Sequence, residues 1–380
     1  MHWRNRPLPG WLRKRLPGRS DAGGPPRKDA WISAYVRETR ADFRRVFAAE
    51  RPPANMPRDT GAALVPFIGL PREYPDIGVL TLPAGVVAGC DGVIFDRDGT
   101  YLIDTNLWFN DYRITPVFGW RKKLAHTRLR GTVLSLLSLW SATNYYHFLI
   151  EAIPRIKIFL ESGIDWHSVD HVLLPAFSGR SGRDIANLLP IPRGKVRHVA
   201  FGEYLFSDIL MATSFPGAPC VAPSWAANFL RSLAPSVGSP HRRVYIRRTS
   251  ARRGLLNEAN IEDLLVRRFG FEVFDYRDSG SSELAIMADA AIIVGPHGAG
   301  LSRMVFAPPG AHVVEILNPQ WLYPFYWSLS QAAGHHYVPL VGSVGGKSLA
   351  SSPVPTSNFI VDLAQLEESI DAVCSRRSDA

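Results

Sequence analysis

Between residues 243 and 317, short apolar runs alternate with amphipathic stretches, and few folds accommodate that pattern. The predicted elements are strands at 243–248, 271–276, 290–295 and 311–317 and helices at 260–270, 281–290 and 299–307. Strands that alternate with helices need crossover connections, and crossovers produce a parallel sheet covered by helices. The sequence therefore predicts a Rossmann-like half, whose ligands bind at the carboxyl ends of its strands.

The first half of the chain shows a similar alternation. The predicted elements are strands at 78–83, 92–103, 131–140, 170–175, 196–201 and 205–213 and helices at 144–163 and 183–189. The longer helix has Asn144 as its N-cap, Gly163 after its end and a kink at Pro154. We therefore predict a second α/β domain with a substantially parallel sheet.

Composition sets the expected domain limits. The chain has 380 residues, 46% of them hydrophobic, which is enough for two cores. An Arg-, Pro- and Gly-rich stretch predicts a flexible basic arm over 1–30, which could contact an anionic membrane surface. The segment 234–243 predicts a boundary between an N-terminal α/β domain at 31–235 and a C-terminal Rossmann-like domain at 236–345. The helical pattern within 346–380 could pack back on the N-terminal domain.

Charge and cysteine content argue against several functional classes. A net charge of +9 with only 20% charged residues indicates an arginine excess and anionic partners. The sequence shows neither basic residues interleaved with aromatics across a wide face nor a known binding motif, so no nucleic-acid partner is expected. The three widely spaced cysteines form neither a disulfide framework nor a paired metal site. Without a spanning apolar run or a signal peptide, the expected location is the cytoplasm, including the inner face of the membrane.

A glycine-rich turn links the strand at 290–295 to the helix at 299–307. Its residues are Gly295, His297, Gly298, Ala299 and Gly300. Backbone N–H groups and the dipole at a helix start favour an anion, and small residues let phosphate oxygens approach closely. Glycine also serves simple tight turns, and His297 could either donate to a diphosphate or be structural.

Six arginines surround the strand at 243–248. They are Arg242, Arg243, Arg247, Arg248, Arg252 and Arg253. Arginine side chains bind phosphate through two parallel hydrogen bonds. Arg247, Arg248 and Arg253 lie at or just past the carboxyl end of the strand, where a ligand would bind, whereas the others fit a solvated basic loop.

Three further polar residues have two possible roles each. Glu315 ends the strand that follows the glycine turn, and it could bind ribose hydroxyls or simply close the strand. Asn257 and Glu258 follow the arginines and could equally be an ordinary helix start.

His147 and Glu151 are four residues apart on the predicted helix and therefore share a face. Histidine titrates near neutral pH, and a neighbouring carboxylate can orient it, as a general base requires. Either residue is a candidate base, and a purely structural pair is the alternative. Two ligands on one helix are too few for a closed metal site.

Three motifs, in this order, resemble the glycosyltransferase family 61 proteins, several bacterial members of which are named for capsular polysaccharide biosynthesis. They are NYYHFLIEAIPR at 144–155, YIRRTSARRGLLNE at 245–258 and IIVGPHGAGLSRMVFAPPGAHVVEIL at 292–317. The resemblance covers roughly residues 75–345 and omits the basic arm. It implies an α/β fold of the GT-B type, in which two Rossmann-like domains face each other across a cleft.

The resemblance also implies a function. It indicates an inverting glycosyltransferase that moves a hexose or pentose from a nucleotide sugar, UDP-linked in characterised members, to a glycan hydroxyl. With arginines and a helix start to hold the diphosphate, no essential metal is expected. The resemblance assigns catalysis to His147 and Glu151. The expected nucleotide-sugar contacts are Arg247 or Arg248, Arg253, Asn257, Glu258, His297, Gly298, Ala299, Gly300 and Glu315. The Asp-x-Asp sequence at 96–98 lies in a predicted strand turn and is not expected to bind metal.

Other functions remain open at this point. A dinucleotide-dependent oxidoreductase should have a G-x-G-x-x-G motif directly after its first strand, and this motif is absent. A noncatalytic nucleotide- or polysaccharide-binding protein would not need His147 and Glu151. A polysaccharide pyruvyl transferase-like enzyme would also bind a phosphorylated donor.

Overall fold

The chain forms two compact units. The computed structural model describes residues 28–49, 76–105, 125–177, 179–199, 203–215, 222–236, 238–248, 253–275, 283–344 and 357–378. Among these residues, the first unit holds those up to 177 and those from 189 to 215, and the second unit holds the rest. Residues 179–188 and 222–235 therefore pack with the second unit, although they lie within the predicted domain 31–235. The predicted basic arm lies, except for its last three residues, outside the described residues.

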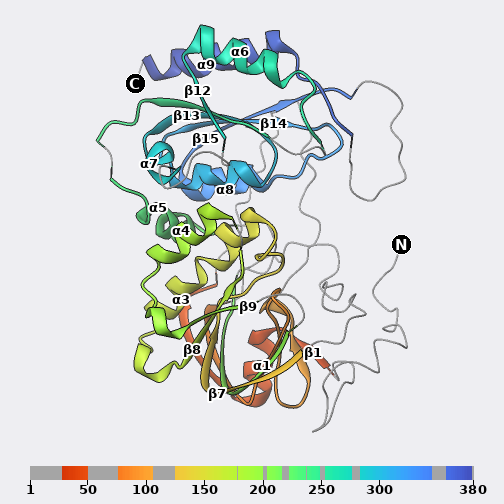
Figure 1. Ribbon diagram of the computed structural model, residues 1–380, viewed down its shortest axis with the longest axis vertical. Coiled ribbons are helices and arrows are strands. Elements are labelled where there is room, and N and C mark those ends of the chain that lie inside the picture. The colour runs from red at the N-terminus through yellow and green to blue at the C-terminus, as the bar shows by residue number, and fades with distance from the viewer. Residues whose placement is uncertain are drawn as a thin grey trace. The chain divides into compact units, whose positions relative to one another are not determined.

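A mixed β-sheet forms the core of the first unit (Figure 1). The described strands are β1 (Lys28–Ala30), β2 (Asp42–Phe47), β3 (Ile77–Pro83), β4 (Val86–Ala88), β5 (Val93–Phe95), β6 (Thr100–Leu102), β7 (Ala125–Ser135), β8 (His171–Pro175), β9 (Val196–Val199) and β10 (Glu203–Thr213). They lie in the order β1-β6-β5-β4-β10-β7-β8-β9, and β3 joins β2 to β10. The strands from β10 to β9 are parallel, as predicted, whereas β10 is antiparallel to β3 and β4.

The prediction of a substantially parallel sheet is therefore wrong for half of this unit. The predicted strand at 92–103 is a hairpin of β5 and β6, and β4 also pairs antiparallel with β5. Gly92 and Gly99 have positive φ angles of 71° and 82° in the connecting turns. Tight turns join antiparallel neighbours, because parallel neighbours need a long crossover.

The predicted helix at 144–163 is divided into two parts. Oδ1 of Asn144 accepts a hydrogen bond from the backbone N–H of Tyr146 at 2.9 Å, which confirms the predicted cap. A π-helix over His147–Ala152 follows, and α3 (Arg155–Glu161) begins after Pro154. Proline has no N–H to continue the helix ladder, so the predicted kink is a break.

The second unit contains a five-stranded parallel sheet in the order β12-β11-β13-β14-β15. Its strands are β11 (Arg242–Ile246), β12 (Glu272–Phe274), β13 (Ala290–Pro296), β14 (His312–Leu317) and β15 (His336–Val341). Its described helices are α4 (Arg180–Leu188), α5 (Ser224–Ser232), α6 (Glu258–Phe269), α7 (Glu283–Ala288), α8 (Phe325–Ala333) and α9 (Leu363–Ser378). The predicted alternation of strands and helices is confirmed. The stretch at 299–307, however, is a 3₁₀-helix over Ala299–Phe306.

Helices cover both faces of this sheet. Figure 1 shows α6 and α9 on one face and α7 and α8 on the other. Leu366, Ile370 and Val373 of α9 lie in a core cluster with Ile261 and Leu265 of α6. The predicted packing of the C-terminal helix on the N-terminal domain is therefore wrong, because its apolar stripe is buried within the second unit.

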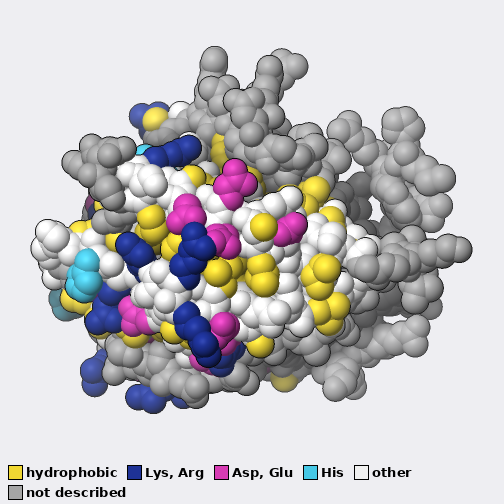
Figure 2. Space-filling model, turned by 90° about the horizontal axis from the view of Figure 1, so that it is seen from above, with side chains coloured by type: hydrophobic (Ala, Val, Ile, Leu, Met, Phe, Trp, Pro, Cys, Tyr) yellow, Lys and Arg dark blue, Asp and Glu magenta, His cyan; other side chains and the backbone are white. Residues whose placement is uncertain are grey.

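The face that carries α6 and α9 has charges of both signs (Figure 2). Arg268 of α6 pairs with Glu367 and Asp371 of α9, and Arg267 pairs with Asp263. The net charge of +9 therefore does not form a continuous basic surface on this face. Over the described residues, each helix is too short or too polar to span a bilayer.

Candidate active site

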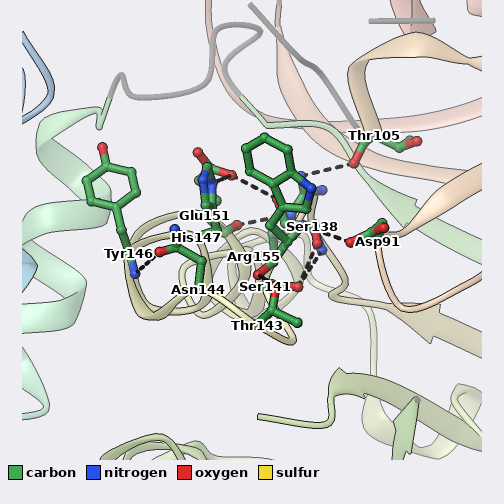
Figure 3. Close-up of polar contacts among 11 residues, drawn as sticks. Asp91, Thr105, Ser138, Ser141, Thr143, Asn144, Tyr146, His147, Glu151 and Arg155 are labelled. Atoms are coloured by element: carbon green, nitrogen blue, oxygen red, sulfur yellow. Dashed lines mark hydrogen bonds and ion pairs between the residues drawn. The ribbon is translucent and has the colours of Figure 1, made fainter. Parts of the chain in front are cut away.

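His147 and Glu151 are in contact in the first unit, as the sequence predicts. Nδ1 of His147 lies 2.9 Å from Oε2 of Glu151, and both side chains are 8% exposed. The hydroxyl of Ser138 donates to the same carboxylate oxygen at 3.1 Å (Figure 3). Both residues belong to the π-helix, an element that occurs frequently at functional sites.

This contact determines which nitrogen of His147 can accept a proton. A carboxylate only accepts hydrogen bonds, so Nδ1 of the neutral ring carries the proton and Nε2 carries the lone pair. Within the described part of the chain, Nε2 forms no hydrogen bond. The rings of Trp140 and Tyr146 lie edge-on to the imidazole, with centroids 5.4 Å and 5.6 Å away. His147 thus has the geometry of a base, and Glu151 that of the group that orients it.

Asp91 is an acidic residue beside this pair that the sequence did not indicate. Its side chain is buried, and Oδ1 accepts a hydrogen bond from the backbone N–H of Trp140 at 2.8 Å. Burial raises the pKa of Asp91 to about 6, although the Trp140 N–H and the charge of His147 act in the opposite direction. No periodic pattern marks Asp91, because it lies in a turn far from the helix in sequence.

Arg155 lies on the other side of Glu151 and is also buried. Its Nε donates to the backbone oxygen of Glu151 at 3.1 Å, and Nη1 donates to the backbone oxygen of Thr213 at 2.7 Å. Burial lowers the pKa of Arg155 to about 10, while Glu151 and Asp104 raise it. Arg155 therefore ties the π-helix to β10. It stands in the first motif, but spacing alone gave it no role.

The second predicted cluster lies at the carboxyl edge of the parallel sheet. β11 lies between β12 and β13, so the chain leaves β11 toward one side and returns on the other. Such a switch point is where open α/β sheets bind ligands. Arg248 follows β11 and His297 follows β13, and Nη1 of Arg248 donates to the backbone oxygen of His297 at 2.5 Å.

Gly298 permits this approach for a steric reason. A Cβ atom at position 298 would lie 1.9 Å from Nη1 of Arg248. The φ angle of Gly298 is 165°, an extended conformation that any residue adopts, so the glycine is needed for space. At Gly300 the nearest atom would be Cγ2 of Ile246 at 3.5 Å, an ordinary contact. Ala299 begins the 3₁₀-helix.

Arg253 and Arg247 have different surroundings. The guanidinium of Arg253 lies 4.8 Å over the ring of Trp321 and has no carboxylate partner among the described residues. Burial and the charge of Arg248 lower the pKa of Arg253 to about 10. Arg247 instead holds Glu262 of α6 through two hydrogen bonds of 2.6 Å and 2.5 Å. Arg247 therefore links the end of β11 to α6.

His297 is held through both ring nitrogens. Its Nδ1 lies 2.5 Å from Oε1 of Glu315, and its Nε2 accepts a hydrogen bond from the Trp321 indole at 3.1 Å. Glu315 is fully buried, and its second oxygen accepts from the hydroxyl of Tyr337. The predicted ribose contact does not fit Glu315, because its carboxylate is buried and both of its oxygens are already engaged. Glu315 orients His297 instead, and in this arrangement Nε2 cannot donate to a diphosphate.

Asn257 and Glu258 fit the alternative of a helix start. Nδ2 of Asn257 donates to the backbone oxygen of Val361 at 2.8 Å. Oε1 of Glu258 accepts from the hydroxyl of Tyr245 and from the backbone N–H of Arg248, both at 2.9 Å. Glu258 thus fixes the backbone of Arg248 at the end of β11.

The described residues contain no group of three or more His, Cys, Asp or Glu side chains arranged to hold a metal ion. The Asp-x-Asp sequence at 96–98 lies in the turn between β5 and β6. Oδ1 of Asp96 accepts there from the backbone N–H groups of Asp98 and Thr100, at 2.9 Å and 2.7 Å. This carboxylate has the role of a turn-forming side chain.

Comparison with known proteins shows a similarity that includes these residues. Residues 145–314 match the model of the family described as Glycosyltransferase 61. No curated protein matches the chain. The matched stretch contains the His147–Glu151 pair, the arginines that follow β11 and the glycine turn that follows β13. Over residues 145–314 the chain is therefore similar to glycosyltransferase family 61, and this similarity supports the activity class of a glycosyltransferase.

Proposed function

We propose that the protein is an inverting glycosyltransferase that transfers a sugar from a UDP-linked donor to a hydroxyl group of a glycan. One observation carries the donor class: Arg248 and Arg253 lie beside the glycine turn at the switch point of a parallel sheet. Burial and the charge of Arg248 lower the pKa of Arg253, and an anion between two such guanidinium groups would stabilise their charge. A diphosphate offers the charge and the oxygen geometry that arginine forks bind best. The preference for UDP follows from the family resemblance.

In the proposed reaction, His147 is the general base. Its Nε2 takes the proton from the acceptor hydroxyl while that oxygen attacks the anomeric carbon of the donor sugar. The bond from this carbon to the diphosphate breaks on the opposite face, which inverts the configuration. Glu151 stabilises the imidazolium that forms, as a buried carboxylate beside Nδ1 can do.

In this proposal, the second unit binds the leaving diphosphate and stabilises its negative charge. Arg248, Arg253 and backbone N–H groups of the turn stabilise it. Because these groups supply positive charge, we expect activity without an added divalent cation. The proposal includes the GT-B-like fold expected from the sequence, with an acceptor-side domain and a donor-side domain.

Calorimetric titration with UDP, with and without chelator, tests the donor site. Arg248→Ala and Arg253→Ala should each weaken UDP binding by about 10- to 100-fold, the usual loss for a charge-assisted hydrogen bond. Arg247→Ala is the matched control, because its guanidinium is engaged by Glu262. It should retain UDP affinity.

Other outcomes would change the assignment. If Arg247→Ala weakens UDP binding and Arg248→Ala does not, the roles of these two arginines are reversed. If UDP does not bind and phosphoenolpyruvate does, the donor is not a nucleotide sugar and the pyruvyl transferase alternative replaces this proposal.

A further inference from the structure

The segment between β7 and the π-helix contains an unusual backbone conformation. Trp140 has a φ angle of 55°, in the left-handed region that residues with bulky side chains avoid. Conformations of this kind persist only where the surroundings enforce them, and they cluster at functional sites. Glycine would adopt this φ angle without strain, so the turn itself does not require tryptophan.

Hydrogen bonds on both sides hold Trp140 in this conformation. Its N–H donates to Oδ1 of the buried Asp91 at 2.8 Å. Its backbone oxygen accepts from the N–H groups of Thr143 and Asn144, at 3.0 Å and 2.9 Å. Asn144 also caps the helix that carries His147. Figure 3 shows Asp91, Asn144 and His147 around this segment. The position of Trp140 is thus tied to that of the proposed base.

The conformation brings the Trp140 ring to His147 and keeps it half-buried. The two ring centroids are 5.4 Å apart, with an angle of 79° between the ring planes. Leu139 and Ser141, on either side, are 1% and 0% exposed, whereas the much larger tryptophan retains contact with solvent. The tryptophan ring therefore lies beside the proposed base and remains partly accessible to solvent.

We propose that Trp140 is the platform on which a pyranose ring of the acceptor glycan stacks. This inference rests on the proposed function and specifies how its acceptor is held. The C–H face of a pyranose is apolar and flat, so it packs against an aromatic ring while its hydroxyl rim stays available for hydrogen bonds. Stacking on Trp140 would orient one of these hydroxyls toward Nε2 of His147. The nucleobase of the donor is not the ligand proposed for Trp140, because it is attached to the diphosphate that the second unit is proposed to bind.

The first test is direct binding of simple sugars to the full chain. The probes are methyl β-glycosides of glucose, galactose, mannose and N-acetylglucosamine, observed by saturation-transfer NMR. The wild type should transfer saturation to the ring protons of at least one probe, and Trp140→Gly should reduce that transfer by about tenfold. Trp140→Phe should retain part of it.

Two controls separate loss of the platform from loss of the fold. Glycine accepts a φ angle of 55°, so Trp140→Gly should unfold at a temperature no lower than that of Trp140→Ala. Trp166 is another half-buried tryptophan of this unit, which packs on Phe159, so Trp166→Phe should bind the glycosides like the wild type.

Kinetics give a second readout that a merely structural role would not produce. With a UDP-sugar and the glycoside that binds best, Trp140→Gly should raise the KM for the acceptor by about tenfold and leave the KM for the donor unchanged. An unchanged acceptor KM, or no saturation transfer from the wild type to any of the four probes, would overturn the platform. Glycoside binding that depends on Trp140 without sugar transfer would overturn the proposed function and leave the platform standing.

Discussion

At the scale of single residues, the two candidate histidines differ in the nitrogen atoms that they leave available. His147 bonds Glu151 through Nδ1, and the described residues leave its Nε2 without a hydrogen bond. His297 bonds Glu315 and Trp321 through both nitrogens. Proton transfer needs an available lone pair, so His147 is the proposed base, and His297 is suited to fixing the turn beside Arg248.

Substitutions at the dyad should separate catalysis from binding. His147→Ala should lower kcat by about 10²–10⁴-fold, the usual contribution of a positioned base. Glu151→Gln should cost less, because the imidazole remains but loses the carboxylate that orients it. UDP affinity, measured by calorimetry, should stay at the wild-type value in both variants. An unaltered kcat in His147→Ala would exclude this residue as the base.

Asp91 should make stability depend on pH. Its folded-state pKa of about 6 lies above the ordinary value of 3.8, so the folded protein holds this proton more tightly than the unfolded chain does. Stability from this group therefore falls as pH rises from about 4 through about 6, and the full penalty applies above that range. Asp91→Asn removes the titration and can still accept from the Trp140 N–H.

Urea unfolding at about pH 5 and about pH 7.5 measures this effect. The stability of Asp91→Asn relative to the wild type should increase by roughly 1–2 kcal/mol between the two conditions. A difference that is the same at both pH values would show that the carboxyl group of Asp91 has an ordinary pKa.

The sequence predicted the contact of His147 with Glu151 but not its surroundings, for a physical reason. His147 and Glu151 are four residues apart on one helix, so local spacing brings them together. Three other residues reach the candidate sites through tertiary contacts, namely Asp91, Trp321 and Tyr337. Local sequence patterns do not predict which distant side chain will contact a given position.

At the scale of elements, the glycine turn was predicted correctly because its chemistry is local. Strand, small residues and helix start follow each other directly in the sequence, and β13 and the 3₁₀-helix lie where expected. The antiparallel half of the first sheet was not predicted, because an apolar run predicts a strand but not which strand pairs with it or in which direction. The Gly298–Arg248 contact was equally hidden, since it joins the ends of two strands.

That contact yields a prediction for the turn. Gly298→Ala should displace the guanidinium of Arg248, because the added Cβ would lie 1.9 Å from its Nη1. UDP affinity should fall by about tenfold or more, comparable to loss of a charge-assisted hydrogen bond. Gly300→Ala, whose Cβ finds its nearest neighbour at 3.5 Å, should weaken binding less. Equal losses in the two variants would mean that the turn does not act through Arg248.

At the scale of the whole molecule, the second unit is completed by segments remote in sequence. The hydroxyl of Ser181 in α4 donates to Glu283 at 2.5 Å, and Glu283 also forms a buried ion pair of 2.9 Å with Arg303. At the other end of the chain, α9 buries Ile370 against α6. Neither attachment follows from sequence, because an amphipathic helix shows which face it buries and not what covers it.

Thermal unfolding can test the attachment of α9. Each unit has its own core, so we expect UDP to stabilise only the unit that binds it, by about 2.7 kcal/mol at a UDP concentration of 100 Kd. Ile370→Ala should destabilise that same unit by about 2–5 kcal/mol, the range for large-to-small changes at fully buried sites. In scanning calorimetry, UDP and Ile370→Ala should therefore shift one transition in opposite directions.

Ile158 in α3 is the matched control, because it is equally buried in the first unit. Ile158→Ala should lower the transition that UDP leaves unchanged. If Ile370→Ala lowers that transition instead, α9 packs on the N-terminal domain, as the sequence alone allowed. Should both variants and UDP all move one common transition, the two units unfold cooperatively, and the unit proposed to bind the donor is not stable independently of the unit that carries His147.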